Sequence, residues 1–186
     1  MGTAPRRYGA VDVHYPVEGG ADAALVVATD DRFATLVAER VSHLPAVEPY
    51  RPGSFFAREL PALRAVLDGA GPHDLLIVDG YVDLDPQGRP GLGAHVHAEF
   101  GVPVVGVAKS AFRGATHAVA VRRGGATRPL YVTAAGLAVA DAARMVADMA
   151  GRYRIPDALR RVDALARGRG YGDAAGMASP LDLSTS

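Results

Sequence analysis

Residues 74–80 read Asp-Leu-Leu-Ile-Val-Asp-Gly, a short run of apolar side chains that ends in a carboxylate and a glycine. A run this short and this apolar is typical of a strand buried on both faces of a sheet. Residues 102–107 form a second such run, and Lys109 follows it. Apolar residues at helical spacing over 56–67 and 94–100 predict a helix before each run. Parallel strands joined by helices bring their carboxyl ends, and the polar residues there, to one edge of the sheet.

The rest of the chain is predicted to add strands and helices around this pair. The expected strands are 7–15, 23–29, 33–44, 117–122 and 129–133, and the expected helices are 138–152 and 157–167. The Ala-Glu-Arg content of 33–44 also permits a helix. This order resembles the ribonuclease H-like fold of the α/β class, a mixed sheet with helices on both faces, in which Asp12 would meet Asp79. We expect one domain over 1–168 and a flexible Gly-, Ala- and Ser-rich tail over 169–186.

Composition excludes several classes of protein. The chain has 186 residues, of which 49% are hydrophobic and 22% charged, as in an ordinary globular domain. It has no cysteine, which excludes disulfides, thiolate metal sites and a cysteine nucleophile. Its apolar stretches are shorter than the roughly 18 residues that a membrane span needs, and its start lacks the apolar segment of a signal peptide. We therefore expect a cytoplasmic protein with no membrane association.

Charge is distributed unevenly although the net charge is zero. Residues 1–112 carry 9 basic and 14 acidic side chains, whereas residues 113–169 carry 11 arginines and 4 acids. This asymmetry suits a protein that holds cations in one place and phosphates in another, although arginines spread over solvated helices would produce it too. Lys109 is the single lysine beside 19 arginines. This lysine indicates a site that needs a compact ammonium, unless a single lysine has remained by chance in an arginine-rich sequence.

Four polar side chains at the starts or ends of predicted elements are candidates for joint chemistry. Asp12 lies within the first strand between two valines, Asp79 ends the apolar run, and Glu59 lies near the start of a predicted helix. Carboxylates from separate elements suit Mg²⁺ or Mn²⁺, with water and phosphate completing the shell. An ammonium from Lys109 beside such a site is the equipment for phosphodiester hydrolysis. Each residue alone also fits a cap, a turn or a surface charge.

Ordered motifs resemble those of the endonuclease V family. Residues 49–61, Pro-Tyr-Arg-Pro-Gly-Ser-Phe-Phe-Ala-Arg-Glu-Leu-Pro, look like its Pro-Tyr-x-Pro-Gly wedge followed by Phe-x-x-Arg-Glu-x-Pro. The other similar segments are Val-Asp-Val-His-Tyr (11–15), Val-Asp-Gly (78–80), Gly-Leu-Gly-Ala-His (91–95), Val-Pro-Val-Val-Gly-Val-Ala-Lys-Ser (102–110) and the segment 153–163. The resemblance covers residues 8 to about 167 in order.

The resemblance implies a divalent-metal-dependent endonuclease that hydrolyses a phosphodiester on the 3′ side of inosine in DNA or RNA, in repair or RNA processing. By this resemblance Asp12, Asp79, Glu59 and Asp163 would be metal ligands, with Mg²⁺ as the cofactor and Mn²⁺ as a substitute. The catalytic set would be Asp12, Glu59, Asp79 and Lys109, and Lys109 would steady the phosphate or the leaving group. The partner would be inosine-containing nucleic acid, bound by a monomer.

The resemblance also implies a substrate-binding set. Tyr50 with Pro52 would fill the gap that a flipped base leaves, because extruding a base costs a few kcal/mol that stacking partly offsets. The backbone at Gly53, Gly80 and Gly91 would line the base pocket, where the absence of a Cβ permits close approach.

Two departures from the family pattern keep an alternative open. Asp85 stands where the family has its active-site histidine, and Gly136 stands where the family has the histidine of a Gly-His-Arg segment. The alternative is a nucleic-acid-binding protein of endonuclease V type with altered or lost catalysis. A single-strand nuclease without base preference is the third hypothesis.

Overall fold

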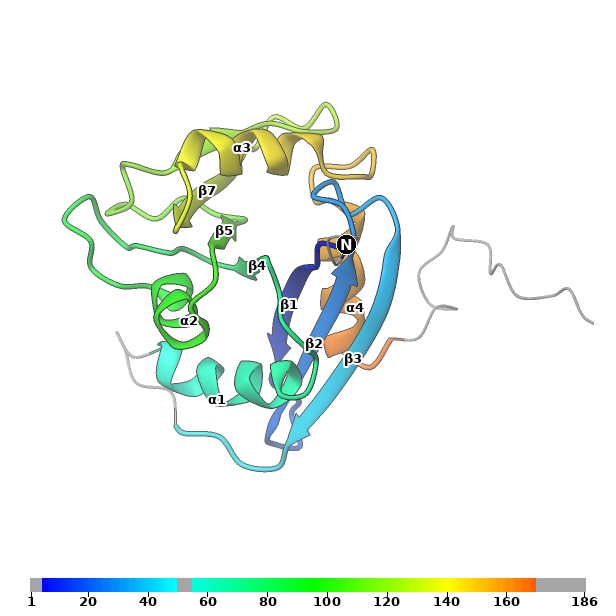
Figure 1. The fold of residues 1–186 in the computed structure, drawn as a ribbon. Coiled ribbons are helices and arrows are strands. Elements are labelled where there is room, and N and C mark those ends of the chain that lie inside the picture. Colours follow the sequence, from blue (N-terminus) through cyan, green and yellow to red (C-terminus); the bar gives the residue numbers. More distant parts are fainter. Residues whose placement is uncertain (1–4, 50–54, 170–186) are drawn as a thin grey trace, which may run out of the picture.

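The computed structural model describes residues 5–49 and 55–169 and folds them around one seven-stranded sheet (Figure 1). The strands are β1 (Tyr8–His14), β2 (Ala21–Ala28), β3 (Leu36–Leu44), β4 (Leu75–Asp79), β5 (Val104–Ala108), β6 (Val119–Val121) and β7 (Leu130–Ala135). The helices are α1 (Phe55–Leu67), α2 (Leu92–Phe100), α3 (Val139–Asp148) and α4 (Asp157–Ala166). Within the described ranges, no helix is long and apolar enough to span a membrane. The predicted tail, 169–186, lies outside the described residues apart from Arg169.

Strand order in the sheet is β3-β2-β1-β4-β5-β7-β6. The first three strands form antiparallel hairpins, β1 pairs in parallel with β4, and β4 pairs in parallel with β5. The two apolar runs are the central strands: Leu75 to Val78 and all of β5 are buried. They can be apolar throughout because helices cover both faces of the sheet. The segment 33–44, which also permitted a helix, forms β3 from Leu36.

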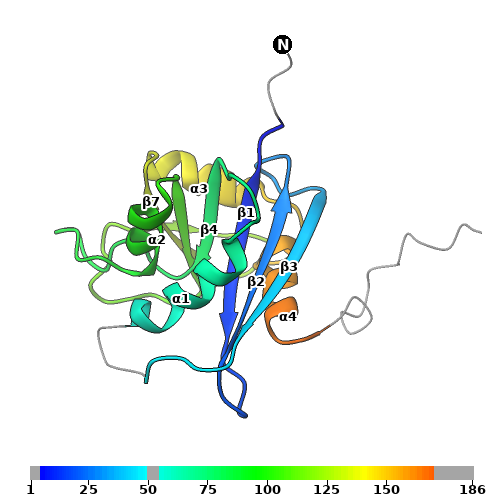
Figure 2. The same cartoon turned by 60° about the horizontal axis from the view of Figure 1, so that its bottom comes forward.

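Alternating side chains along the central strands divide the core into two layers. Figure 2 shows the helices that lie around the sheet. Ala10, Ile77 and Val105 point to the layer under α3 and α4. Val11 and Val78 point to the opposite layer, under α1 and α2. Side chains of a strand alternate between the two faces, so residues two apart share a face. This parity determines on which side the polar residues at the strand ends emerge.

One predicted helix is shorter than its sequence pattern. The helix expected over 138–152 ends as α3 at Asp148, and Met149 leaves the helical conformation. The side chain of Arg123 donates to the carbonyl oxygens of Ala147, Met149 and Gly151. The last carbonyls of a helix have no partner within it, and the arginine supplies one from another part of the chain. The long-range contact, rather than the local pattern, therefore sets where α3 ends.

Candidate active site at the ends of the central strands

Three predicted site residues are brought together by strand parity and register. Asp12 follows Ala10 by two residues in β1, Asp79 follows Ile77 in β4, and Lys109 lies two beyond Val107 after β5. All three therefore face the α3–α4 side of the sheet. Because β4 lies between β1 and β5, the register places them side by side. They line one small cavity, whose other walls are Val11, Val107, Leu130, Ile155, Leu159 and Val162.

The cavity holds an ion pair and opens to solvent. The ammonium of Lys109 lies 2.5 Å from Oδ2 of Asp79, and the two side chains are 41% and 36% exposed. Burial lowers the pKa of Lys109, but the hydrogen bond and charge of Asp79, with Asp12 and Asp163, outweigh it and raise that pKa. The cavity volume of about 10 Å³ suits one water-sized or ion-sized occupant. A nucleotide would have to bind at its mouth rather than inside it.

Asp12 is the more enclosed carboxyl group of the pair. Burial, and then the charge of Asp79, raise the pKa of Asp12 to about 7, although Lys109 opposes the shift. Its Oδ1 accepts a hydrogen bond of 2.9 Å from the backbone N–H of Val13. Removal from water and a second negative charge both disfavour the ionised form of this carboxyl group, and a nearby cation would favour it.

Glu59, on α1, is not among the residues that line the cavity, but it lies within electrostatic range of Asp12 and Asp79. Its side chain is 7% exposed, and burial, followed by the charges of Asp12 and Asp79, raises its pKa to about 8. Sequence reasoning missed its neighbours: the guanidinium of Arg58 lies 3.8 Å from the ring centroid of Tyr15. Burial and the charge of Glu59 raise the pKa of Tyr15, which keeps that phenol protonated. The sequence did contain a hint of this contact, because Tyr15 ends the motif around Asp12 and Arg58 directly precedes Glu59.

Asp163, the fourth predicted ligand, lies on α4 and is already engaged. Its Oδ1 accepts from Nε of Arg167 at 3.0 Å. Its charge also contributes, as the smallest of the causes, to the raised pKa of Asp12. Asp163 thus lies within electrostatic range of Asp12 and Lys109 without lining the cavity, and its assignment as a ligand stays a prediction.

The carboxylate oxygens of Asp12 and Asp79 are the kind of ligand that a hard divalent cation binds. Across 5–49 and 55–169, no three His, Asp or Glu side chains already stand in an arrangement that could hold a metal ion. Mg²⁺, however, keeps several waters and needs only one or two protein carboxylates besides substrate phosphate. Asp12 and Asp79 supply those two on one cavity wall. The raised pKa values of Asp12 and Glu59 mark a cluster that either protons or a cation must neutralise.

Of the predicted substrate-binding residues, Tyr50, Pro52 and Gly53 lie outside the described residues. Gly80 directly follows Asp79 and has φ +133°, which an L side chain rarely adopts. A Cβ at Gly91 would lie 2.5 Å from the carbonyl oxygen of Tyr81. Gly91 therefore packs closely on the backbone that follows β4, whereas Gly80 is required for its backbone angle alone. Their role in base binding stays a prediction.

The two departures from the expected pattern have structural reasons. Oδ1 of Asp85 accepts the backbone N–H groups of Gln87 at 3.1 Å and Arg89 at 3.0 Å, so the carboxylate fixes its own loop. Asp85 is not among the residues that line the cavity. Gly136 has φ +76°, and a Cβ there would lie 3.0 Å from the His97 ring. A histidine at 136 would have a strained backbone and would require the His97 ring to shift slightly.

Comparison with known proteins identifies relatives of the whole fold. Residues 2–140 match the family model described as Endonuclease V. An endonuclease V of Azotobacter vinelandii is 32% identical over 180 residues, covering 86% of this chain and 81% of that protein. The crystal structure of endonuclease V from Streptomyces avermitilis superposes with TM-score 0.74 at 29% identity, covering 87% of this chain and 80% of that one.

A structure of Ciona intestinalis endonuclease V is similar in fold. It superposes with TM-score 0.70 at 19% identity, covering 88% of this chain and 84% of that one, and is a complex with a 23mer DNA containing an inosine followed by a ribo-adenosine. These matches confirm the ribonuclease H-like fold and the resemblance that the sequence motifs indicate.

Proposed function

The chain belongs to the endonuclease V family, and we propose on that premise that it is a divalent-metal-dependent endonuclease. It hydrolyses a phosphodiester on the 3′ side of inosine or deoxyinosine in nucleic acid. The observation that carries the proposal is the convergence of Asp12, Asp79 and Lys109 on one cavity at the ends of β1, β4 and β5. The Ciona intestinalis relative, which was crystallised with inosine-containing DNA, supports the substrate class.

The proposed roles follow from position and charge. Asp12 and Asp79, on the adjacent parallel strands β1 and β4, would hold Mg²⁺, or Mn²⁺ in its place. When bound, a divalent cation supplies electrostatic stabilisation of the charge that develops on the reacting phosphate. Glu59 completes the ligand set or orients the attacking water from the helix side, and Asp163 faces the pair from α4.

Lys109 has a role that the other basic residues cannot fill. Its ammonium already contacts Asp79, so a phosphate that enters beside the cation meets a positive charge at a fixed position. It neutralises charge on a nonbridging oxygen or on the leaving oxygen as the bond to phosphorus breaks. A compact ammonium can share this space with two carboxylates, whereas a planar guanidinium needs a wider site.

A nucleic-acid-binding protein with lost catalysis is the second candidate. Asp85 and Gly136 favour it, because neither position carries the histidine of the family pattern and the described fold accommodates both replacements. The proposals that the protein acts as a monomer, and in the cytoplasm, stay predictions from the sequence.

Cleavage of labelled strands tests the proposal. Strands with one inosine, one deoxyinosine or neither are incubated with the protein in Mg²⁺, in Mn²⁺ and in EDTA. We expect one cut 3′ of the modified nucleotide, with metal only, and none with Asp79→Asn. Asp141→Asn is the matched control, because Asp141 is an exposed acid on α3 that also pairs with a basic residue. Binding without cleavage in every metal would select the second candidate, and equal cutting of all strands would select a nuclease without base preference.

A further inference from the structure

An exposed aromatic side chain lies between α3 and α4 with two arginines on it. Tyr153 is 46% exposed, although it is a large aromatic residue. The guanidinium carbons of Arg152 and Arg160 lie 4.9 and 4.8 Å from its ring centroid. Arg152 also donates a 2.6 Å hydrogen bond to the tyrosine hydroxyl. We refer to these three residues as the Arg152–Tyr153–Arg160 cluster.

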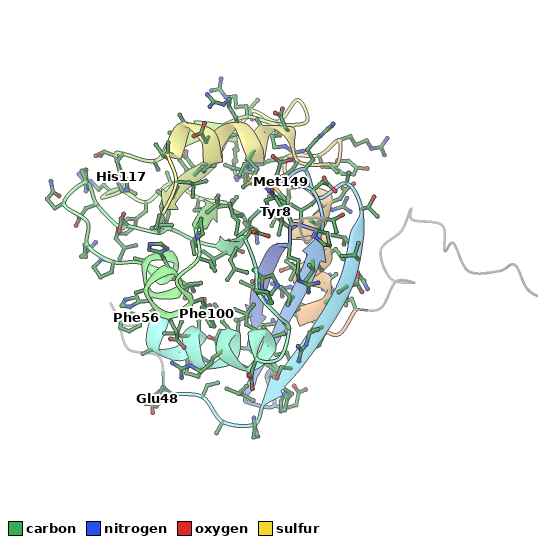
Figure 3. The ribbon with its side chains drawn as sticks, viewed as in Figure 1. Tyr8, Glu48, Phe56, Phe100, His117 and Met149 are labelled. Atoms are coloured by element: carbon green, nitrogen blue, oxygen red, sulfur yellow. The ribbon has the colours of Figure 1, made fainter. Side chains whose placement is uncertain are left out.

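A buried arginine fixes the loop that presents the cluster. Arg123 is 7% exposed, and its guanidinium donates to the carbonyl oxygens of Ala147, Met149, Gly151 and Tyr153. Figure 3 labels Met149, where α3 gives way to this loop. A guanidinium has its donors in a rigid planar fork, so four acceptors around it define the path of the chain. The cluster is thus preorganised rather than carried on a loose loop.

Residues adjacent to the cluster in the chain connect it to the cavity wall. Arg154, which follows Tyr153, donates to the carbonyl oxygens of Lys109 and Pro129. Ile155 and Leu159, close to Tyr153 and Arg160 in the chain, form part of the cavity wall. A polymer whose phosphate reaches Lys109 would therefore pass within reach of the cluster.

The chemistry of the cluster matches a nucleic-acid strand. Guanidinium groups bind phosphates, and an exposed aromatic ring stacks on any base. Asp157 competes for Arg160, but at 3.5 Å and on the surface this ion pair contributes little. We propose that the Arg152–Tyr153–Arg160 cluster is a nucleic-acid contact outside the catalytic cavity, which binds the strand next to the scissile phosphate without reading its sequence. This inference rests on the proposed function for its substrate class.

Binding measurements on surface variants test the inference. Arg160→Ala, Tyr153→Ala and Tyr153→Phe are made in an Asp79→Asn background, so that the strand stays intact with or without Mg²⁺. Arg144→Ala is the matched control: Arg144 on α3 pairs with an aspartate three residues earlier, as Arg160 does on α4. Fluorescence anisotropy gives Kd for labelled single strands with and without inosine over a range of salt.

The expected results differ between variants. Tyr153→Ala weakens binding by about 5- to 20-fold, whereas Tyr153→Phe, which keeps the ring, binds as the background protein does. Arg160→Ala lowers the slope of log Kd against log salt by about one, as expected for the loss of one phosphate contact. Both losses are equal for inosine and unmodified strands, and Arg144→Ala changes neither quantity.

The outcomes separate the inference from the function on which it rests. If Arg160→Ala and Tyr153→Ala bind like the background protein, the inference is overturned, whatever the parent cleaves. Failure of the background protein to bind any strand overturns it too. If the cluster variants lose binding but the parent cuts no inosine strand in any metal, the proposed function fails and the cluster remains a nucleic-acid contact.

Discussion

Replacing Glu59 with glutamine should stabilise the metal-free protein at high pH. Glu59 is 7% exposed, and burial together with Asp12 and Asp79 raises its pKa from 4.5 to about 8. Below pH 4.5 the folded and unfolded states both hold the proton, and the residue has no effect on stability. As pH rises from 4.5, the unfolded chain ionises first, so the free energy of unfolding falls until the folded pKa is passed.

The size of the pKa shift of Glu59 determines how much stability the parent protein loses at high pH. A difference of 3.5 pKa units corresponds to roughly 5 kcal/mol above pH 8, an upper limit because the folded protein relaxes around the charge. Glutamine has nearly the same volume and does not titrate. The stability advantage of Glu59→Gln over the parent should therefore grow by about 2–4 kcal/mol between pH 5 and pH 9. Any packing cost of the amide is constant with pH and cancels in this comparison.

Urea unfolding in EDTA at pH 5, 7 and 9 measures the effect. Glu18→Gln is the control, because Glu18 is exposed in the loop between β1 and β2. Adding Mg²⁺ at pH 9 should stabilise the parent more than Glu59→Gln, since a cation relieves the cost that the substitution removes. An advantage that stays constant from pH 5 to pH 9 would refute the reasoning about the buried acidic cluster.

Three further changes have definite expected outcomes. Lys109→Arg should cut the turnover of an inosine strand by at least about tenfold, measured by single-turnover cleavage, because a planar fork replaces a point charge beside two carboxylates. Arg123→Met should lower the free energy of unfolding by about 3 kcal/mol in urea, because it leaves one buried and three partly buried carbonyl acceptors without their donor. Gly136→His should lower the melting temperature rather than restore activity, since φ +76° and the His97 ring oppose a side chain there.

The positions of Asp12 and Asp79 were predictable because they depend on patterns that are local in the sequence. The apolar run before Asp79 predicts a buried strand, and the alternation around Asp12 gives the face of β1. Helical crossovers then force β4 and β5 to be parallel, which brings Lys109 to the same edge. The spacing of apolar residues and the apolar character of each run are sufficient to predict these elements. Both can be read from short segments of the sequence.

Features that depend on contacts between distant segments were not predictable. Nothing near Arg123 in the sequence indicates that its side chain ends α3 and shapes the loop after it. The sequence also does not predict that Asp163 pairs with Arg167. Any acid and base four residues apart on a helix have the same spacing, whether or not they form an ion pair. Which partner each of these side chains contacts depends on the residues that the folded chain brings next to it.

The candidate site's cavity takes its wall from elements that lie far apart in the sequence, from β1 to α4. Its first wall residue is Val11 and its last is Val162 on α4. During synthesis on a ribosome, the strands carrying Asp12 and Asp79 are made long before the helix that closes the site. Domains fold as units once their last contributing element has emerged. A growing chain therefore lacks a complete candidate site until α4 has been made, and a chain that terminates before α4 should not form this cavity.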